Sequence, residues 1–191
     1  VASHDRAVLG SAESASQSLG QLYEHGRYDD EISGLQAQLE TLVALLGEED
    51  ESTLTSRNNY AGLLNVLGRY EQAEEQWQLT LERQLRLFGT EHPQTLATQA
   101  NYSVVLSNLG RIRDAERSDY LALRGRLRTL GELHPDTLSS LDNYAVLLAE
   151  LGRVPEADAI HRLAIEGCLR VLGPEDPATL HALSNYAIYV N

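Results

Sequence analysis

The chain has 191 residues, of which 42% are hydrophobic and 23% charged, and these proportions are those of an ordinary globular protein rather than a disordered one. Its formal net charge is −13, and all 15 basic residues are arginines. A surface this acidic repels phosphate backbones and anionic lipid, which argues against nucleic-acid and membrane partners and favours a neutral or basic protein partner. The same excess of acid also fits a charge that only keeps the protein soluble.

The cysteine content excludes some kinds of site, and the lack of long apolar runs bears on where in the cell the protein is expected. Cys168 is the only cysteine, which excludes an intrachain disulfide and a cysteine-rich metal site, and in its helical pattern it is interpreted as a small packing residue. No apolar run approaches the roughly eighteen residues of a membrane span, and no signal-peptide pattern opens the chain. We therefore expect a cytoplasmic protein. Because Met is absent even at position 1, we also expect an excised segment of a longer protein.

An Asn-Tyr pair recurs at a fixed period through most of the chain. Each asparagine of the pair lies 42 positions after the one before it, at Asn59, Asn101, Asn143 and Asn185. A fixed period in this range is typical of a solenoid in which each repeat packs on its neighbours. Residues 1–47 form a degenerate first copy, in which Gly26-Arg27-Tyr28 aligns with Gly68-Arg69-Tyr70 but Gln17 and Ser18 replace the Asn-Tyr pair. End repeats are often atypical because one of their faces meets solvent.

Each complete period predicts a pair of helices. In the first complete copy, apolar residues at helical spacing predict one helix from Ser52 to Leu67 and a second from about Glu71 to Phe88. Gly68 and Gly89 follow these two helices, where a helix end favours a residue that accepts a positive φ. The repeats are then 48–89, 90–131 and 132–173. Residues 174–191 give one last helix, which either caps the array or has lost its partner.

The linkers into the first helix of each copy are also repeated. Pro93, Pro135 and Pro177 are expected at the first position of a helix, since proline lacks an N–H that would be unpaired there. His92 and His134 precede two of these prolines in the register that also holds Asp50 and Asp176. Because these polar residues suit the position before a helix, we interpret them as caps rather than as metal ligands.

The pattern Asn59-Tyr60-Ala61-x-x-Leu64-x-x-x-Gly68-x-Tyr70-x-x-Ala73 resembles the tetratricopeptide repeat. The usual period of that repeat is about 34 residues. The longer period, the His-Pro-x-Thr-Leu opening and the Leu-Gly ending resemble the kinesin light chain subclass and related bacterial arrays. The resemblance implies an all-α fold, a right-handed superhelix whose concave wall consists of the first helix of each pair. Family members bind peptides on that wall.

The resemblance also implies which residues would contact a ligand. In the kinesin light chain type, an asparagine at the site of Asn59, Asn101, Asn143 and Asn185 can bond the main chain of an extended peptide, and a side-chain amide offers both a donor and an acceptor. Residues three, four and seven positions from these share a helix face. They extend the predicted wall to Thr55, Asn58, Gly62, Asn65, Val66, Val104, Asn108, Ser139, Asp142, Val146 and Glu150.

The predicted wall is rich in amides, mildly acidic and without a basic residue. Family members that grip acidic peptide tails do so with Lys and Arg on this side, so a neutral, apolar or basic segment fits better here. In the alternative interpretation, each asparagine only ties neighbouring helices together or caps a backbone group. Tyr60 and its copies are expected to pack between helices rather than to stack on bases.

No catalytic constellation is visible in the sequence. Glu74-Glu75 and Asp114-Ala115-Glu116-Arg117 are interpreted as solvated helix faces. A nucleophile elbow, a phosphate-binding loop and a zinc-protease motif are all missing, so we predict neither an enzyme nor a bound cofactor or metal.

Three functions stay open at this point. The first is a non-catalytic module that binds an extended peptide or partner segment in the concave groove. The second is the sensor or autoinhibitory segment of a larger bacterial signalling NTPase or transcriptional regulator, where similar arrays are common. The third is an architectural scaffold that self-associates through the open last helix, which makes a homo-oligomer possible.

Overall fold

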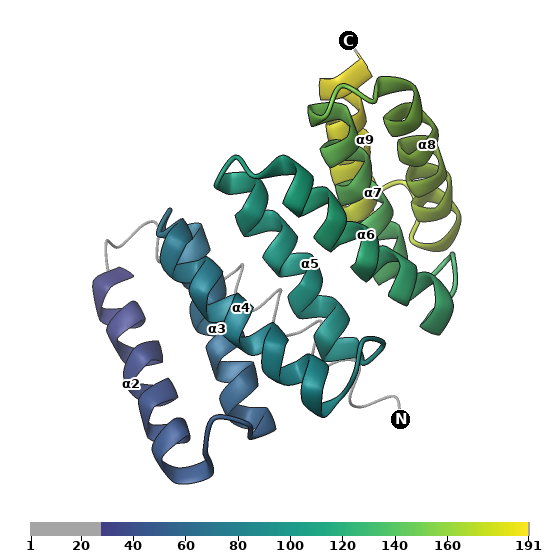
Figure 1. The fold of residues 1–191 in the computed structure, drawn as a ribbon. Helices are drawn as coiled ribbons and strands as arrows, with labels where there is room; N and C mark the ends of the chain where they lie inside the picture. Colours follow the sequence, from purple (N-terminus) through teal and green to yellow (C-terminus); the bar gives the residue numbers. More distant parts are fainter. Residues whose placement is uncertain (1–27, 191) are drawn as a thin grey trace.

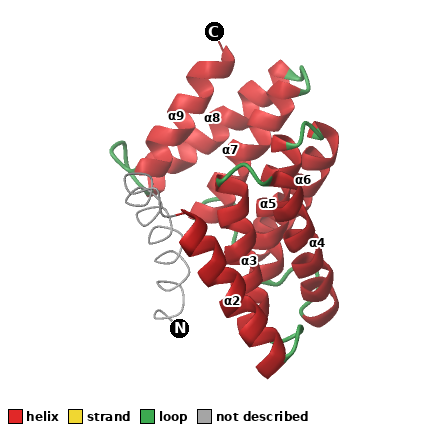
Figure 2. Cartoon of the chain, turned by 90° about the vertical axis from the view of Figure 1, so that its left-hand side faces the viewer, coloured by secondary structure: helices red, strands yellow, loops and turns green. Residues whose placement is uncertain are grey.

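The computed structural model describes residues 28–190, and in this part the chain forms eight helices joined by short loops, with no strand (Figures 1 and 2). They are α2 (Tyr28–Leu46), α3 (Glu51–Val66), α4 (Tyr70–Leu87), α5 (Pro93–Asn108), α6 (Ile112–Thr129), α7 (Pro135–Glu150), α8 (Val154–Val171) and α9 (Pro177–Val190). The expected all-α superhelix of paired helices is confirmed. The residues that mark the degenerate first copy, Gln17 and Ser18 among them, lie outside the described residues.

The helix ends follow the local signals in the sequence. Asp50 caps α3 by accepting a hydrogen bond from the backbone N–H of Ser52 at 2.8 Å. The ring of His134 does the same for α7, where Nδ1 accepts from the N–H of Asp136 at 3.1 Å. At the other end of α3, Gly68 has φ 73°, which allows the N–H of Arg69 to reach the carbonyl of Leu64 at 2.9 Å. The interpretation of these linker residues as caps is confirmed for Asp50, His134 and Asp176, which accepts from the N–H of Ala178 at 2.8 Å. It is wrong for His92, which precedes α5 without a side-chain capping bond.

Two layers result from the pairing. The first helices of successive repeats touch directly, α3 with α5 and α7 with α9, while each second helix packs mainly on the first helices before and after it in sequence. The core between the layers consists of small and branched apolar residues, among them Leu54, Leu64 and Ala73, and the single tryptophan, Trp77, is only 3% exposed. The first helices therefore present one continuous face and the second helices the opposite one.

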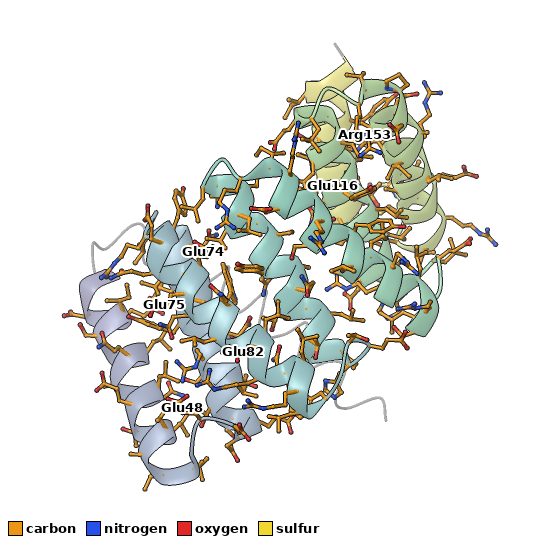
Figure 3. The ribbon with its side chains drawn as sticks, viewed as in Figure 1. Glu48, Glu74, Glu75, Glu82, Glu116 and Arg153 are labelled. Carbon is orange, nitrogen blue, oxygen red and sulfur yellow. The ribbon has the colours of Figure 1, made fainter. Side chains whose placement is uncertain are left out.

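The tyrosines of the repeated pair connect one repeat to the previous one. The hydroxyl of Tyr144 in α7 donates to Glu116 in α6 at 2.9 Å, and that of Tyr186 in α9 donates to Asp158 in α8 at 2.8 Å. Arg153 also pairs with Glu116 (Figure 3). Glu116 is thus a structural acid at a repeat junction, so its interpretation as part of a solvated helix face is wrong. The sequence interpretation of the tyrosines as packing residues is right, with the hydroxyl bond as an addition.

Candidate binding face on the first helices

The open side of α3, α5, α7 and α9, called the first-helix face below, carries nearly all of the residues predicted for ligand contact. Thr55, Asn59, Val66, Val104, Asn108, Ser139 and Glu150 are exposed, and Asn58, Gly62, Asn65, Asn101, Asn143, Val146 and Asn185 are half-buried. Asp142 alone is buried, with 4% of its surface exposed. The helical spacing therefore selects positions that solvent reaches, with this one exception, and their contact with a ligand stays a prediction.

A row of side-chain hydrogen bonds crosses from α5 to α3 on this face. The amide of Asn108 donates to Asn65 Oδ1 at 2.9 Å, and that of Asn101 donates to Asn58 Oδ1 at 3.4 Å. Gln94 continues the row by donating to Glu51 at 2.7 Å. The three donors are seven residues apart and thus lie on one line along α5. Part of the amide content of this face is therefore used between repeats, as the alternative interpretation of the asparagines proposes.

A buried residue of the second helix also hydrogen-bonds to a member of this row. Trp77 in α4 donates its indole Nε1–H to Asn58 Oδ1 at 2.9 Å, the same oxygen that Asn101 approaches. An amide oxygen has two lone pairs and can accept both bonds. Asn58 is therefore fixed in orientation between the core and the open face.

The third repeat builds the same junction with charged residues. Asp142 in α7 takes the place of Asn58, and its Oδ1 lies 3.1 Å from Nδ1 of the fully buried His161 in α8. Its Oδ2 accepts from the amide of Asn185 in α9 at 2.8 Å and lies 3.2 Å from Nδ1 of His181. Asp142 faces these partners rather than the open surface, because a carboxylate at this depth requires hydrogen bonds that solvent does not supply.

Between α5 and α7 the row has a break at its middle position. The hydroxyl of Ser107 in α5 still donates to Glu150 in α7 at 3.4 Å. The residue equivalent to Asn58 is here Ala100, which offers no acceptor, and Asn143 has no hydrogen-bond partner among the described residues. Asn59 also lacks a partner in the described part of the chain; its counterpart 43 positions earlier lies outside that part. Within residues 28–190, the amides of the first-helix face without a hydrogen-bond partner are thus those of Asn59 and Asn143.

Asp119 in α6 occupies the place of Trp77 and His161 behind the break. Its side chain has no exposed surface, and its Oδ1 accepts from the hydroxyl of Ser103 at 3.2 Å, while Oδ2 has no partner among the described residues. Burial raises the pKa of this carboxyl to about 7, although the bond from Ser103 and the charge of Arg126 both act to lower it. The middle repeat thus has a titratable core group where its neighbours have a bonded pair.

A pocket of about 430 Å³ lies where the first-helix face meets α2. Its lining includes two of the predicted contact residues, Thr55 and Asn59, together with Glu51, Gln38 and Leu42. Glu51 and Gln94 were missed by the sequence analysis, as was His181, whose side chain is 66% exposed. His181 lies in the register of Thr55 and Ser139, so the period contained the signal that could have found it.

The described residues offer neither a metal site nor a membrane-spanning helix. No group of three or more His, Cys, Asp and Glu side chains within residues 28–190 could hold a metal ion. In the same range, no helix has the length and the apolar character that crossing a membrane requires. What the face offers a ligand is amides, small side chains and a few acids.

Comparison with known proteins gives the same family as the repeat pattern. Two tetratricopeptide repeat family models match residues 52–128 and 137–178, which together are more than half of the chain. The chain has no significant match among curated protein sequences.

Solved structures agree in fold. A putative kinesin light chain of Podosopora anserina with nearly identical TPR-like repeats superposes with a TM-score of 0.76 at 21% identity, covering 93% of this chain and 84% of that one. BtubC (BKLC) from P. vanneervenii gives a TM-score of 0.78 at 21% identity, covering 98% and 75%. The family matches and the shared fold together show that the chain belongs to the tetratricopeptide repeat family, a family of protein-protein interaction modules, with the architecture of kinesin light chain-like arrays.

Proposed function

We propose that the chain is a non-catalytic interaction module that binds an extended peptide segment of a partner protein along the first-helix face. The observation that carries the proposal is the break at the middle of the row between α5 and α7. The amide of Asn143 has no partner there among the described residues, while the next position keeps the bond from Ser107 to Glu150. An amide that is half-buried and unpaired offers a donor and an acceptor at a spacing suited to a peptide unit.

The neighbouring asparagines would extend the contact. Asn101 uses one N–H toward Asn58 and keeps its carbonyl oxygen and a second N–H. Asn185 donates to Asp142, and its amide nitrogen also lies 3.3 Å from Nδ1 of His181, so it keeps its carbonyl oxygen. These bonds also fix the amides before a ligand arrives, which lowers the entropy cost of binding. Main-chain pairing with such amides does not depend on the ligand sequence, so selectivity would come from side-chain contacts.

The charges on the face favour a neutral, apolar or basic segment. Glu51 and Glu150 are exposed at its two ends, and none of its described residues is an arginine. An acidic peptide would meet like charge and no guanidinium to pair with. The pocket lined by Thr55 and Asn59 would take an apolar or basic side chain of the segment.

A binding measurement with single amide variants tests the proposal. A random-peptide display library is panned on the full chain, and the best binder is synthesised with a fluorescent label. Asn143→Ala is expected to weaken binding of this peptide about tenfold, and the double change with Asn101→Ala more strongly, because hydrogen bonds to the main chain are lost. Gln78→Ala, an exposed amide on the opposite face in α4, serves as the matched control.

Circular dichroism is used to verify that the variants keep their helix content and melting temperature. Unchanged affinity in the double variant, with an intact fold, would exclude the amide mechanism. Equal loss in the Gln78→Ala control would place the peptide on the opposite face.

A further inference from the structure

The outer stripes of α4 and α6 carry opposite charges at equivalent positions. On α4 the stripe consists of exposed acids at i, i+4 and i+11, namely Glu71, Glu75 and Glu82 (the last two labelled in Figure 3). On α6 the residues one period later are all exposed arginines, Arg113, Arg117 and Arg124. Residues at this spacing share the side of a helix that lies opposite its buried side. The charge reversal therefore lies on the outer face of the second helices.

These six charges take no part in ion pairs within the described residues, although the guanidinium of Arg124 also lies over the ring of Tyr120, 5.7 Å from its centre. The same helices form ion pairs elsewhere, for example between Arg111 and Glu74 at 2.5 Å. The two stripes thus stay available as one acidic and one basic line on neighbouring helices.

An apolar depression lies between the two lines. A pocket of about 330 Å³ is lined by Leu85 of α4, Leu96 of α5 and Leu121 of α6, with Arg124 and Arg128 at its edge. Leu85 is 39% and Leu121 49% exposed. An apolar centre with a charged rim is the usual composition of a protein interface.

We propose that this α4–α6 surface binds the same surface of a second copy of the chain, with a two-fold axis that runs between α4 and α6 and parallel to them. Rotation about such an axis leaves the height of each residue along the helix unchanged. It places α4 of one copy opposite α6 of the other. Because the stripes are equivalent in register, Glu75 then faces Arg117 of the second copy, and Glu82 faces Arg124. Leu85 and Leu121 each lie against the same residue of the second copy, near the axis. The contact is isologous and closes at two subunits.

Other occupants leave part of the surface unmatched. A two-fold axis perpendicular to the helices would place α4 on an antiparallel α4, with one acidic line against the other. An acidic segment of another protein would match the arginines but leave the glutamate stripe without a partner. The second copy alone pairs both lines at once.

The surface lies on the second helices, opposite the first-helix face, so the dimer and the proposed peptide binding are independent and can fail separately. The net charge of −13 makes two copies repel each other over long distances. At about 150 mM salt the Debye length of about 8 Å screens this repulsion, while ion pairs in direct contact are affected less.

Sedimentation equilibrium at this salt concentration, over a protein range from about 1 to 500 µM, tests the proposal. The wild-type chain is expected to show a monomer-dimer equilibrium. Arg117→Glu with Arg124→Glu makes both lines acidic, and Glu75→Arg with Glu82→Arg makes both lines basic. Each double variant alone is expected to lose at least about tenfold in association constant.

Mixing the two variants is the decisive measurement, because in the mixed pair every acidic line faces a basic one. The 1:1 mixture should recover dimers, and so should the chain that carries all four changes. The basic-line variant also controls for net charge, since it is less acidic than the wild type and still must lose the dimer. Glu166→Arg with Arg170→Glu, on the outer face of α8, should leave the dimer unchanged.

A monomeric wild type across the range, or a mixture that stays monomeric while both variants keep their helix content, would overturn the proposal. Species larger than dimers in the mixture would replace the closed two-fold contact by an open chain. A monomeric wild type that binds an acidic peptide through Arg117 would assign the surface to a foreign partner instead.

Discussion

His161 in α8 lies 3.1 Å from the carboxylate of Asp142 in α7, at the place in the third repeat where Trp77 in α4 donates to Asn58 in α3. Two chemically different pairs thus have the same role. Each holds a polar residue of a first helix at the boundary between the core and the open face. In both repeats this residue also accepts a hydrogen bond from an asparagine amide of the next first helix, that of Asn101 or Asn185. The pair therefore couples the inside of a repeat to the contact with its neighbour.

Loss of the Asp142 carboxylate should be costly. Asp142→Ala leaves the buried His161 without this partner and removes the acceptor of Asn185, so we expect the free energy of unfolding to fall by about 2–4 kcal/mol. Urea unfolding followed by circular dichroism measures this change. The adjacent Asn143→Ala is the control, with an expected change within about 0.5 kcal/mol, because Asn143 has no partner among the described residues. Equal effects of the two changes would show that the buried junction does not stabilise the array.

Burial at one register position differs between repeats. Leu138 in α7 is 1% exposed and lies against Gly167 of α8, where a Cβ would overlap its side chain, whereas Leu180 in α9 is 54% exposed. Leu138→Ala is expected to lower the free energy of unfolding by about 2–5 kcal/mol, and Leu180→Ala by less than about 1 kcal/mol. Thermal and urea unfolding of the two variants side by side measure the difference. A large loss in Leu180→Ala would show that this side chain is covered in solution.

Most of the fold followed from the period. The structure places the first helix of the first complete copy at Glu51–Val66, one residue from the expected range, and the second at Tyr70–Leu87. Caps and turn glycines are local signals, so Asp50 and Gly68 could be interpreted without knowledge of the packing. The side of the helix that carries Asn143 likewise follows from helical spacing alone.

The burial of individual side chains and their hydrogen-bond partners could not be predicted from the sequence in the same way. Asp142 lies at the edge of its helix face, and its burial depends on His161, 19 residues later, which only the crossing of α7 and α8 brings close. The sequence pattern around Glu116 predicts a solvated acid, because its tyrosine partner, Tyr144, lies 28 residues away in the sequence. The recurrence of an acid at Glu74, Glu116 and Asp158 was visible, but its meaning required the geometry between repeats.

The junction between Tyr144 and Glu116 gives a further prediction. Burial, together with the bond to Glu116, raises the pKa of Tyr144 to about 12, so the hydroxyl stays a donor at any ordinary pH. Tyr144→Phe removes the bond while keeping the ring, and we expect a loss of about 1 kcal/mol in the free energy of unfolding, with no change in helix content. Chemical denaturation at pH 7 measures it. The double variant with Glu116→Gln should lose less than the two single losses combined, and strict additivity would argue against the contact.

The middle repeat should respond to pH through Asp119. Its carboxyl has a pKa of about 7 in the folded chain, against an ordinary value of 3.8, because burial disfavours the charged form. Between these two values the folded state holds a proton that the unfolded state has released. The stability contributed by this group is therefore fully present below about pH 4, falls as the pH rises through about 7, and is constant above that.

Asp119→Asn isolates this contribution. The amide carries no charge at any pH, so at pH 8 the variant should be more stable than the wild type by about 1–3 kcal/mol, with a difference that shrinks steadily toward pH 5. Urea unfolding of both chains at several pH values gives the difference directly, and titration of all other groups cancels. Asp158→Asn is the matched control of opposite sign, because the bond from Tyr186 and the charge of Arg162 lower the pKa of Asp158 and make its charged form stabilising. A stability difference for Asp119→Asn that stays constant from pH 5 to 8 would show that the carboxyl is ionised in the core throughout, held by Ser103 and Arg126.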